Sequence, residues 1–229
     1  MKDDDIRIPP FETHDLRTNL KKFLDSDFNG QKVGNYTYGV YAFFDYDGEP
    51  IYVGQTNEKL RTRIRRHLTN QRTDAVAMSV LDPFEVYEIE VWPLVNYEGV
   101  TKKSNPKKYK VACNILNSLE FTVFEKAIAE SKFNAILNEK DPTSPNTSSL
   151  IPKSFRQCIV SAEVHAIRKH PDFRIARRAL ILARLAQVIS ERQVSTGLRK
   201  TLLTQAKRLQ WLAQRRYDSA NDLDKGEDE

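Results

Sequence analysis

An ordered set of residues in the first half of the chain could hydrolyse a phosphodiester bond. Residues 39–41 read Gly-Val-Tyr and residues 52–54 read Tyr-Val-Gly, and Arg63, His67 and Glu120 follow them. Phosphodiester hydrolysis needs positive charge on the pentavalent phosphate, an activated water and help for the leaving oxygen. A site that combines phenols, a guanidinium, an imidazole and a carboxylate suits this reaction.

Two strands joined by a tight turn are expected to position the tyrosines. Residues 38–44 are aromatic and β-branched and predict a strand. Asp47-Gly48 predicts a hairpin turn, and residues 51–54 predict the returning strand. Because strand side chains alternate between faces, hairpin pairing can bring Tyr52 alongside Tyr41, so that two phenols converge.

A short basic helix is expected to follow, over residues 57–70. Leu60, Ile64 and Leu68 recur every four residues with arginines between them. Arg63 and His67 are four residues apart and therefore share a face of this helix.

These residues resemble the motifs of the GIY-YIG nuclease family. Residues 39–41 and 52–54 stand where that family has Gly-Ile-Tyr and Tyr-Ile-Gly, with Val for Ile in both, and the spacing of the two tyrosines is typical. Residues 63–67 resemble its Arg-x-x-x-His helix. Leu119-Glu120 stands where the family has a metal-binding Glu, and Phe133-Asn134 resembles the motif that closes the module. The resemblance covers residues 38–138 and implies a metal-dependent DNA endonuclease.

The resemblance implies a role for each matched polar residue. Glu120 would hold a single divalent cation, Mg²⁺ or Mn²⁺, although Glu125 is a rival on the same helix. Arg63 would donate two hydrogen bonds to phosphate oxygens, a bidentate geometry that lysine does not match. Tyr41 would help to deprotonate the attacking water, and Tyr52 and His67 would orient water or phosphate or relay the proton.

Three matched residues are expected to be structural. Gly39 and Gly54 would allow backbone and substrate to approach closely. Asn134 would tie the end of a helix to the sheet.

The fold class expected is α/β (α+β), a small three-stranded antiparallel sheet flanked by helices with a helical C-terminal domain. Residues 84–92 alternate and predict the third strand, whereas residues 13–25 and 111–133 carry apolar stripes typical of helices. The expected organisation is an N-terminal extension over 1–35, the nuclease module over 36–140 and a Pro/Ser-rich linker over 141–152. A basic helical domain over 153–217, broken at His170-Pro171 and near Gly197, and a disordered acidic tail over 218–229 complete it.

The charge distribution predicts a polyanionic partner. Residues 151–217 contain 15 Lys and Arg against 3 Asp and Glu, although the net charge of the chain is only +5. We therefore expect DNA as the partner, and a homodimer would allow both strands to be cut. The cations expected to contact DNA are Arg61, Arg66, Lys102, Lys103, Lys107, Lys108, Arg177 and Arg178.

Composition excludes some other classes of protein. No apolar run is long enough to cross a bilayer, no secretory signal is evident at the N-terminus, and Cys113 and Cys158 form no disulfide or zinc pattern. We expect a reducing, cytoplasmic location. The expected role is restriction or anti-phage defence. A structure-specific repair or homing nuclease, or a non-catalytic nucleic-acid-binding module, remains the alternative.

Overall fold

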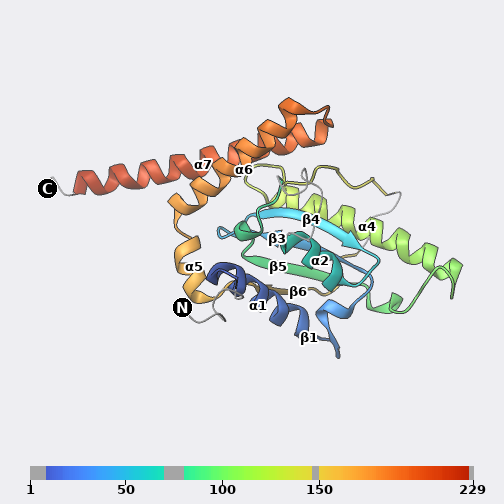
Figure 1. Cartoon of the computed structure of the whole chain (residues 1–229). Helices are drawn as coiled ribbons and strands as arrows, with labels where there is room; N and C mark the ends of the chain where they lie inside the picture. Colours follow the sequence, from blue (N-terminus) through green and yellow to red (C-terminus); the bar gives the residue numbers. More distant parts are fainter. Residues whose placement is uncertain (1–8, 70–79, 146–149, 227–229) are drawn as a thin grey trace.

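A four-stranded antiparallel sheet lies at the centre of the computed structural model, which describes residues 9–69, 80–145 and 150–226 (Figure 1). The strands are β3 (Gly39–Phe44), β4 (Pro50–Thr56), β5 (Glu88–Pro93) and β6 (Phe155–Cys158), in the order β4-β3-β5-β6. The mixed α/β class is confirmed, and the sheet has one strand more than expected. Residues 155–158 were expected in the helical domain, but they pair with β5 from Glu88 to Val91.

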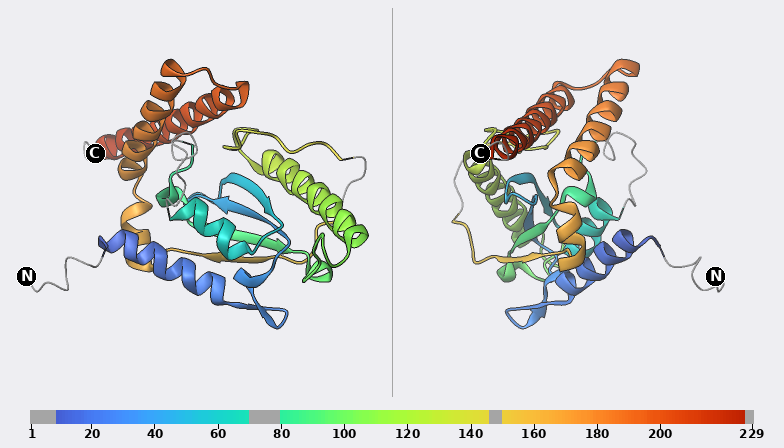
Figure 2. Two further views of the ribbon diagram at one scale, coloured as in Figure 1. Left: turned by 45° about the vertical axis from the view of Figure 1, so that its right-hand side comes forward. Right: turned by 90° about the vertical axis from the view of Figure 1, so that its left-hand side faces the viewer.

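Helices cover both faces of this sheet (Figure 2). α1 (Phe11–Asp25) and α2 (Leu60–Leu68) lie on one face, and α4 (Pro106–Glu130) lies on the other. A short ribbon of β1 (Asp27–Phe28) and β2 (Gln31–Lys32) follows α1. Short 3-10 helices η2 (Val33–Asn35), η3 (Pro83–Glu85) and η4 (Val95–Tyr97) complete the module.

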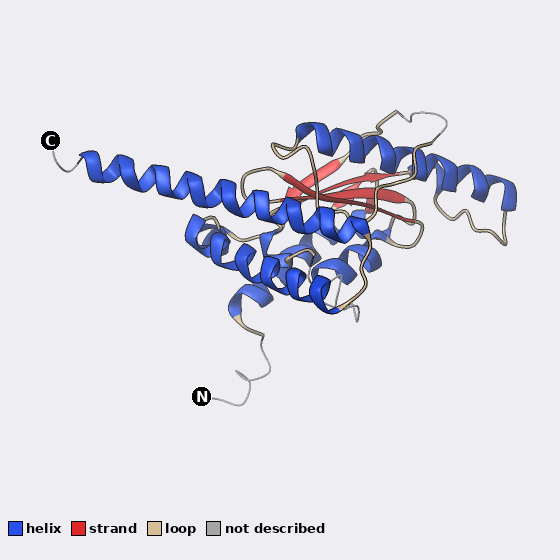
Figure 3. Cartoon of the chain, turned by 90° about the horizontal axis from the view of Figure 1, so that it is seen from above, coloured by secondary structure: helices blue, strands red, loops and turns tan. Residues whose placement is uncertain are grey.

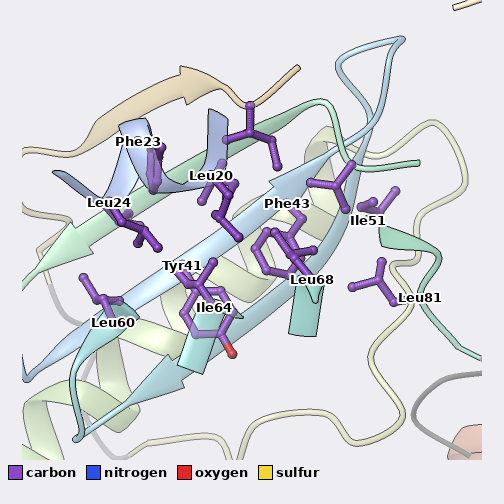
Figure 4. Packing of buried hydrophobic residues seen from close by; sticks show 14 of the residues in the cluster. Leu20, Phe23, Leu24, Tyr41, Phe43, Ile51, Leu60, Ile64, Leu68 and Leu81 are labelled. Carbon is purple, nitrogen blue, oxygen red and sulfur yellow. The ribbon is translucent and has the colours of Figure 1, made fainter. Parts of the chain in front are cut away.

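Strand β3 is buried along its whole length because it lies between two strands and two helical layers. Its side chains alternate between the layers: Tyr41 and Phe43 pack toward α1 and α2, and Val40 and Ala42 pack toward α4. Figure 4 shows Tyr41 and Phe43 among the leucines of that first layer. The central position of β3 therefore gives Tyr41 a rigid, apolar setting.

Two element boundaries differ from the sequence-based expectation. α4 begins at Pro106, five residues before the expected start at residue 111, because the Asn105 side chain accepts the Lys108 amide hydrogen and proline suits the first helical position. The start of the expected third strand is instead the 3-10 helix η3, where the Asp82 side chain accepts from the Phe84 amide.

Three helices follow β6: α5 (Ala162–Arg168), α6 (Pro171–Glu191) and α7 (Thr196–Gly226). The breaks expected at His170-Pro171 and near Gly197 are confirmed. α6 and α7 pack side by side, and α7 extends past the body of the molecule (Figure 3). Residues 218–226 of the expected disordered tail are part of α7, whereas 227–229 lie outside the described residues. No helix in the described ranges is long and apolar enough to span a membrane.

The helical region is joined to the β3–β4 turn by a cluster of buried charges, which we call the arginine dock (Asp45, Glu85, Arg174, Arg178 and Arg208). One carboxylate oxygen of Asp45 accepts from all three guanidinium groups, at 2.6 Å from Arg208 and 2.9 Å from Arg178. Arg178 also donates to Glu85 at 2.9 Å. All three arginines are at most 3% exposed. Much of the positive charge of this region is therefore neutralised inside the protein.

Candidate active site

The Tyr41 hydroxyl group is the meeting point of the first catalytic candidates. It lies 2.9 Å from Nε2 of His67, and Nε of Arg63 donates to its oxygen at 3.4 Å. The Tyr52 ring stacks on the Tyr41 ring with their centroids 6.2 Å apart, and its centroid lies 5.0 Å from that of the tilted His67 ring. The hairpin and the helix α2 thus bring two phenols, an imidazole and a guanidinium together.

Gly54 makes room for this arrangement. It pairs directly opposite Tyr41 across the hairpin. A Cβ atom at this position would lie 2.6 Å from the Tyr41 hydroxyl oxygen, which is too close for any side chain. Gly39 is constrained less severely, because a Cβ there would lie 3.2 Å from the Trp92 carbonyl oxygen.

Glu120 approaches from the opposite face of the sheet. It lies on α4, beside Gln55 on β4, and β4 is the edge strand of the sheet. The charge of Glu120 still acts on the Tyr41 hydroxyl, and that of Arg63 acts on Glu120. The candidates therefore meet around the edge of β4.

Three adjoining hollows, which we call the cleft, connect these side chains. The outer hollow, of about 290 Å³, is lined by Arg63 from α2 and Asn117 from α4. The middle hollow, of about 260 Å³, shares Gln55 and Asn117 with it and contains Glu120. The inner hollow, of about 180 Å³, is lined by Tyr52 and His67. Every catalytic candidate except the buried Tyr41 lines the cleft.

Burial strongly affects both groups that could exchange protons. It raises the pKa of Glu120 to about 7, although hydrogen bonding by Gln55 and the charge of Arg63 oppose this. Burial also raises the pKa of Tyr41 well above its usual value, and Tyr52 adds to this while Arg63 opposes it. Without further positive charge, the Tyr41 phenol therefore keeps its proton.

The comparison with protein families agrees with this geometry. Residues 37–110 match the family model of the GIY-YIG catalytic domain. The chain contains a GIY-YIG catalytic domain. It is therefore a nuclease, a hydrolase of phosphodiester bonds, and a nucleic-acid substrate is implied. No curated protein and no solved structure matches the chain significantly.

The donor groups of the middle hollow fit a hard divalent cation, which GIY-YIG nucleases typically use. Glu120 offers a carboxylate and Gln55 an amide oxygen, whereas the Asn117 amide oxygen accepts from the Gln55 amide nitrogen at 2.8 Å. The described residues contain no group of three or more His, Cys, Asp or Glu that could hold a metal. Asp141 also lines this hollow but is bound by Lys200, so Glu120 would be the carboxylate ligand of a Mg²⁺ ion, which keeps several waters and binds phosphate oxygens.

The tie between the helix end and the sheet in the GIY-YIG module is made by a different asparagine from the one expected. The buried Asn138 accepts from the Val53 amide at 3.1 Å and donates to the Val53 carbonyl at 2.7 Å. Asn134 is exposed and has a positive φ of 49°, as in a tight turn. Because of the turn that follows α4, the residue that contacts β4 is Asn138, four residues after Asn134.

Several cations expected to bind nucleic acid have partners inside the protein. Arg61 pairs with Asp25 at 2.6 Å, and Arg66 pairs with Glu58 at 2.8 Å. Arg178 belongs to the arginine dock and is too buried to reach DNA, which corrects that expectation. Arg177 forms two hydrogen bonds to Asp82. The remaining candidates, Lys102, Lys103, Lys107 and Lys108, lie exposed at the start of α4 and in the loop before it.

Among the residues that line the cleft, Gln55, Asn117 and Lys140 were missed by sequence reasoning. Two of them carry a local signal. Gln55 directly follows the Tyr-Val-Gly motif, and Asn117 lies three residues before Glu120, on the same face of a helix. The third, Lys140, could not have been found, because its position depends on the turn after α4.

Proposed function

We propose that this chain is a Mg²⁺- or Mn²⁺-dependent endonuclease that hydrolyses phosphodiester bonds of DNA. The supporting observation is the meeting of Tyr41, Arg63 and His67 with Glu120 around the edge of β4. A pure binding module has no need of a carboxylate beside a polyanion. Here the carboxylate of Glu120 lies in the cleft although burial disfavours its charged form.

The proton pathway follows from the hydrogen bonds of Tyr41. Arg63 donates to the phenol oxygen, so the phenol can donate its own proton to Nε2 of His67 when that imidazole carries its hydrogen on Nδ1. As the attacking water bonds to phosphorus, its proton passes to the Tyr41 oxygen and the Tyr41 proton passes to His67. His67 then gives this proton to water in the cleft, and a water molecule protonates the leaving oxygen as the phosphorus–oxygen bond breaks. The products are an alcohol and a phosphate monoester.

Charge stabilisation completes the reaction. Glu120 would hold a divalent cation, which would supply positive charge to the scissile phosphate. Arg63 supplies a second positive charge through its paired N–H groups, which match two phosphate oxygens. Tyr52 packs against the His67 ring at a tilt of 51° and holds it in place.

The four exposed lysines near the start of α4 are proposed to contact the DNA backbone outside the cleft. Lys107 and Glu120 lie thirteen residues apart on one helix, which corresponds to roughly 20 Å. Lys102, Lys103 and Lys108 lie close to Lys107 in sequence. Phosphates several nucleotides from the scissile bond could therefore reach these lysines while the scissile phosphate lies near Glu120.

Glu120→Gln tests the proposal directly. With supercoiled plasmid and Mg²⁺, we expect the wild-type chain to cut, EDTA to prevent cutting, and the variant to be slower by at least about 10³-fold. The matched control is Glu125→Gln, an exposed carboxylate on the same helix, which should cut normally. Normal cutting by Glu120→Gln would refute the metal assignment. An RNA duplex in parallel tests whether DNA is the substrate.

For the biological role we propose restriction or anti-phage defence. The support is that the described residues join the catalytic domain to one docked helical unit. Discrete plasmid fragments would favour this role. Nicks confined to branched DNA would indicate a structure-specific repair nuclease, cutting at one rare long site would indicate a homing nuclease, and a gel shift without cleavage would indicate a binding module.

Double-strand cutting leads to a further proposal, that two copies of the chain act together. One cleft can hold one scissile phosphate, and closed two-fold dimers are the commonest oligomers. A monomer should convert supercoiled plasmid mainly to nicked circles at low protein concentration. Linear product should increase steeply with protein concentration if two copies are needed.

A further inference from the structure

Lys140 lies at the junction of the middle and inner hollows of the cleft. Of the residues that the structure describes, it alone lines both hollows, so it lies between Glu120 on one side and Tyr52 and His67 on the other. Within the described parts of the chain, it is also the only Lys or Arg lining either hollow. The positive charge of Arg63, by contrast, lines the outer hollow.

The backbone that carries Lys140 is fixed to the edge strand. The Leu137 amide donates to the Ile51 carbonyl at 2.8 Å, and Asn138 hydrogen-bonds both the amide and the carbonyl of Val53. Lys140 follows two residues later. Its main chain is therefore placed against the strand that carries Tyr52.

The helical region holds this segment from the other side. Gly197, at the start of α7, packs so closely on Glu139 that a Cβ atom would overlap the Glu139 carbonyl oxygen. Lys200 of α7 binds both carboxylate oxygens of Asp141, at 3.0 and 2.9 Å. The acid next to Lys140 is thus already paired, and no ion pair to Lys140 itself occurs within the described ranges. Its ammonium group is available for another anion.

We infer that Lys140 binds a non-bridging oxygen of the scissile phosphate from the inner end of the cleft, while Arg63 binds from the outer end. This inference rests on the proposed DNA cleavage. A phosphate held between Glu120, Tyr52 and His67 lies beside Lys140, and its negative charge increases as the fifth oxygen bonds to phosphorus. A lysine supplies a compact positive charge without the fixed fork of an arginine. The ammonium group therefore stabilises the transition state more than the bound substrate.

Single-turnover cleavage tests the inference with matched variants. Lys140→Gln should lower the rate of cleavage in Mg²⁺ by about 10- to 100-fold, and Lys140→Arg should recover most of it. The control is Lys126→Gln, an exposed lysine paired with Glu130 on α4, which should cut at the wild-type rate. Equal rates for Lys140→Gln and Lys126→Gln would overturn the inference. A loss of rate with a matching fall in melting temperature would also overturn it, because the role would then be structural.

A binding measurement separates this inference from the proposed function. In the Glu120→Gln background, we compare the slope of the logarithm of the DNA-binding constant against the logarithm of the salt concentration. Lys140→Gln should make this slope less steep by roughly one unit. Lys126→Gln should leave the slope unchanged. If the wild-type chain fails to cut, the proposed function fails, yet this slope still reports on the phosphate contact. An unchanged slope with Lys140→Gln would overturn the contact whether or not the enzyme cuts.

Discussion

The cleft and the arginine dock both place arginines near carboxylates, but they use the charges differently. In the dock, one carboxylate oxygen of Asp45 accepts from three buried guanidinium groups, so charge is compensated within the protein. In the cleft, Arg63 donates to a phenol, and Glu120 lines an open hollow. The comparison teaches that a basic sequence does not by itself identify the surface that binds nucleic acid.

The largest expected effect comes from removing charge in the cleft. Arg63→Ala should reduce the cleavage rate by about 10³-fold, equivalent to about 4 kcal/mol of transition-state stabilisation, with little change in melting temperature. The control is Arg65→Ala on the same helix, because residues two apart point to opposite sides. If Arg63→Ala unfolds the protein as readily as it stops cleavage, the contrast with the dock is lost.

Removing charge in the dock should affect stability instead. Asp45→Asn leaves three buried guanidinium groups without their shared carboxylate and should lower the free energy of unfolding by about 3 kcal/mol. Denaturant unfolding measures this. Asp172→Asn, which breaks an exposed pair with Arg216, should change stability little. Equal effects of the two variants would show that the dock does not hold the helices in place.

A smaller effect is expected from the pH dependence of Glu120. Its pKa is about 7 in the folded protein and near 4.5 when unfolded, so the folded state binds more protons between these pH values. The free energy of unfolding should therefore fall as pH rises through this window, by about 1–2 kcal/mol after allowance for solvent screening. Glu120→Gln should abolish that fall. Cleavage should rise with pH through about 7, because protons and Mg²⁺ compete for the same carboxylate.

The smallest effect distinguishes exposed cations from cations that are paired within the protein. Lys107→Gln should weaken DNA binding a few-fold and lower the salt dependence by roughly one unit of slope. Arg177→Gln should leave the slope unchanged and lower stability, because that guanidinium binds Asp82. A lower slope for Arg177→Gln would restore the original expectation that this arginine contacts DNA.

Much of the module could be predicted because its signals are local. The hairpin depends on strand residues around Asp47-Gly48, and α2 depends on leucines and isoleucine at helical spacing. The meeting of Tyr41 with Tyr52 follows from the pairing register of that hairpin. The match over residues 37–110 lies in this same stretch of local pattern.

Other features could not be predicted because distant contacts decide them. Residues 155–158 form a strand because β5 offers an unpaired edge, whereas the surrounding composition predicts helices. Asn138 rather than Asn134 reaches β4 because the turn after α4 sets the distance. Cationic composition pointed to Arg178 as a DNA contact, but Asp45 lies 133 residues away in sequence and could not be recognised as its partner.

The sequence by itself determined the hairpin, the basic helix and the family of the catalytic domain, because side-chain periodicity and motif spacing act over a few neighbouring residues. Only the tertiary structure decided which charges remain available to a substrate. Burial and pairing depend on residues brought together from distant parts of the chain. Pairing with Asp45 neutralises the buried Arg178 in the dock. Arg63, Glu120 and Lys140 instead line the cleft, where a substrate can reach them.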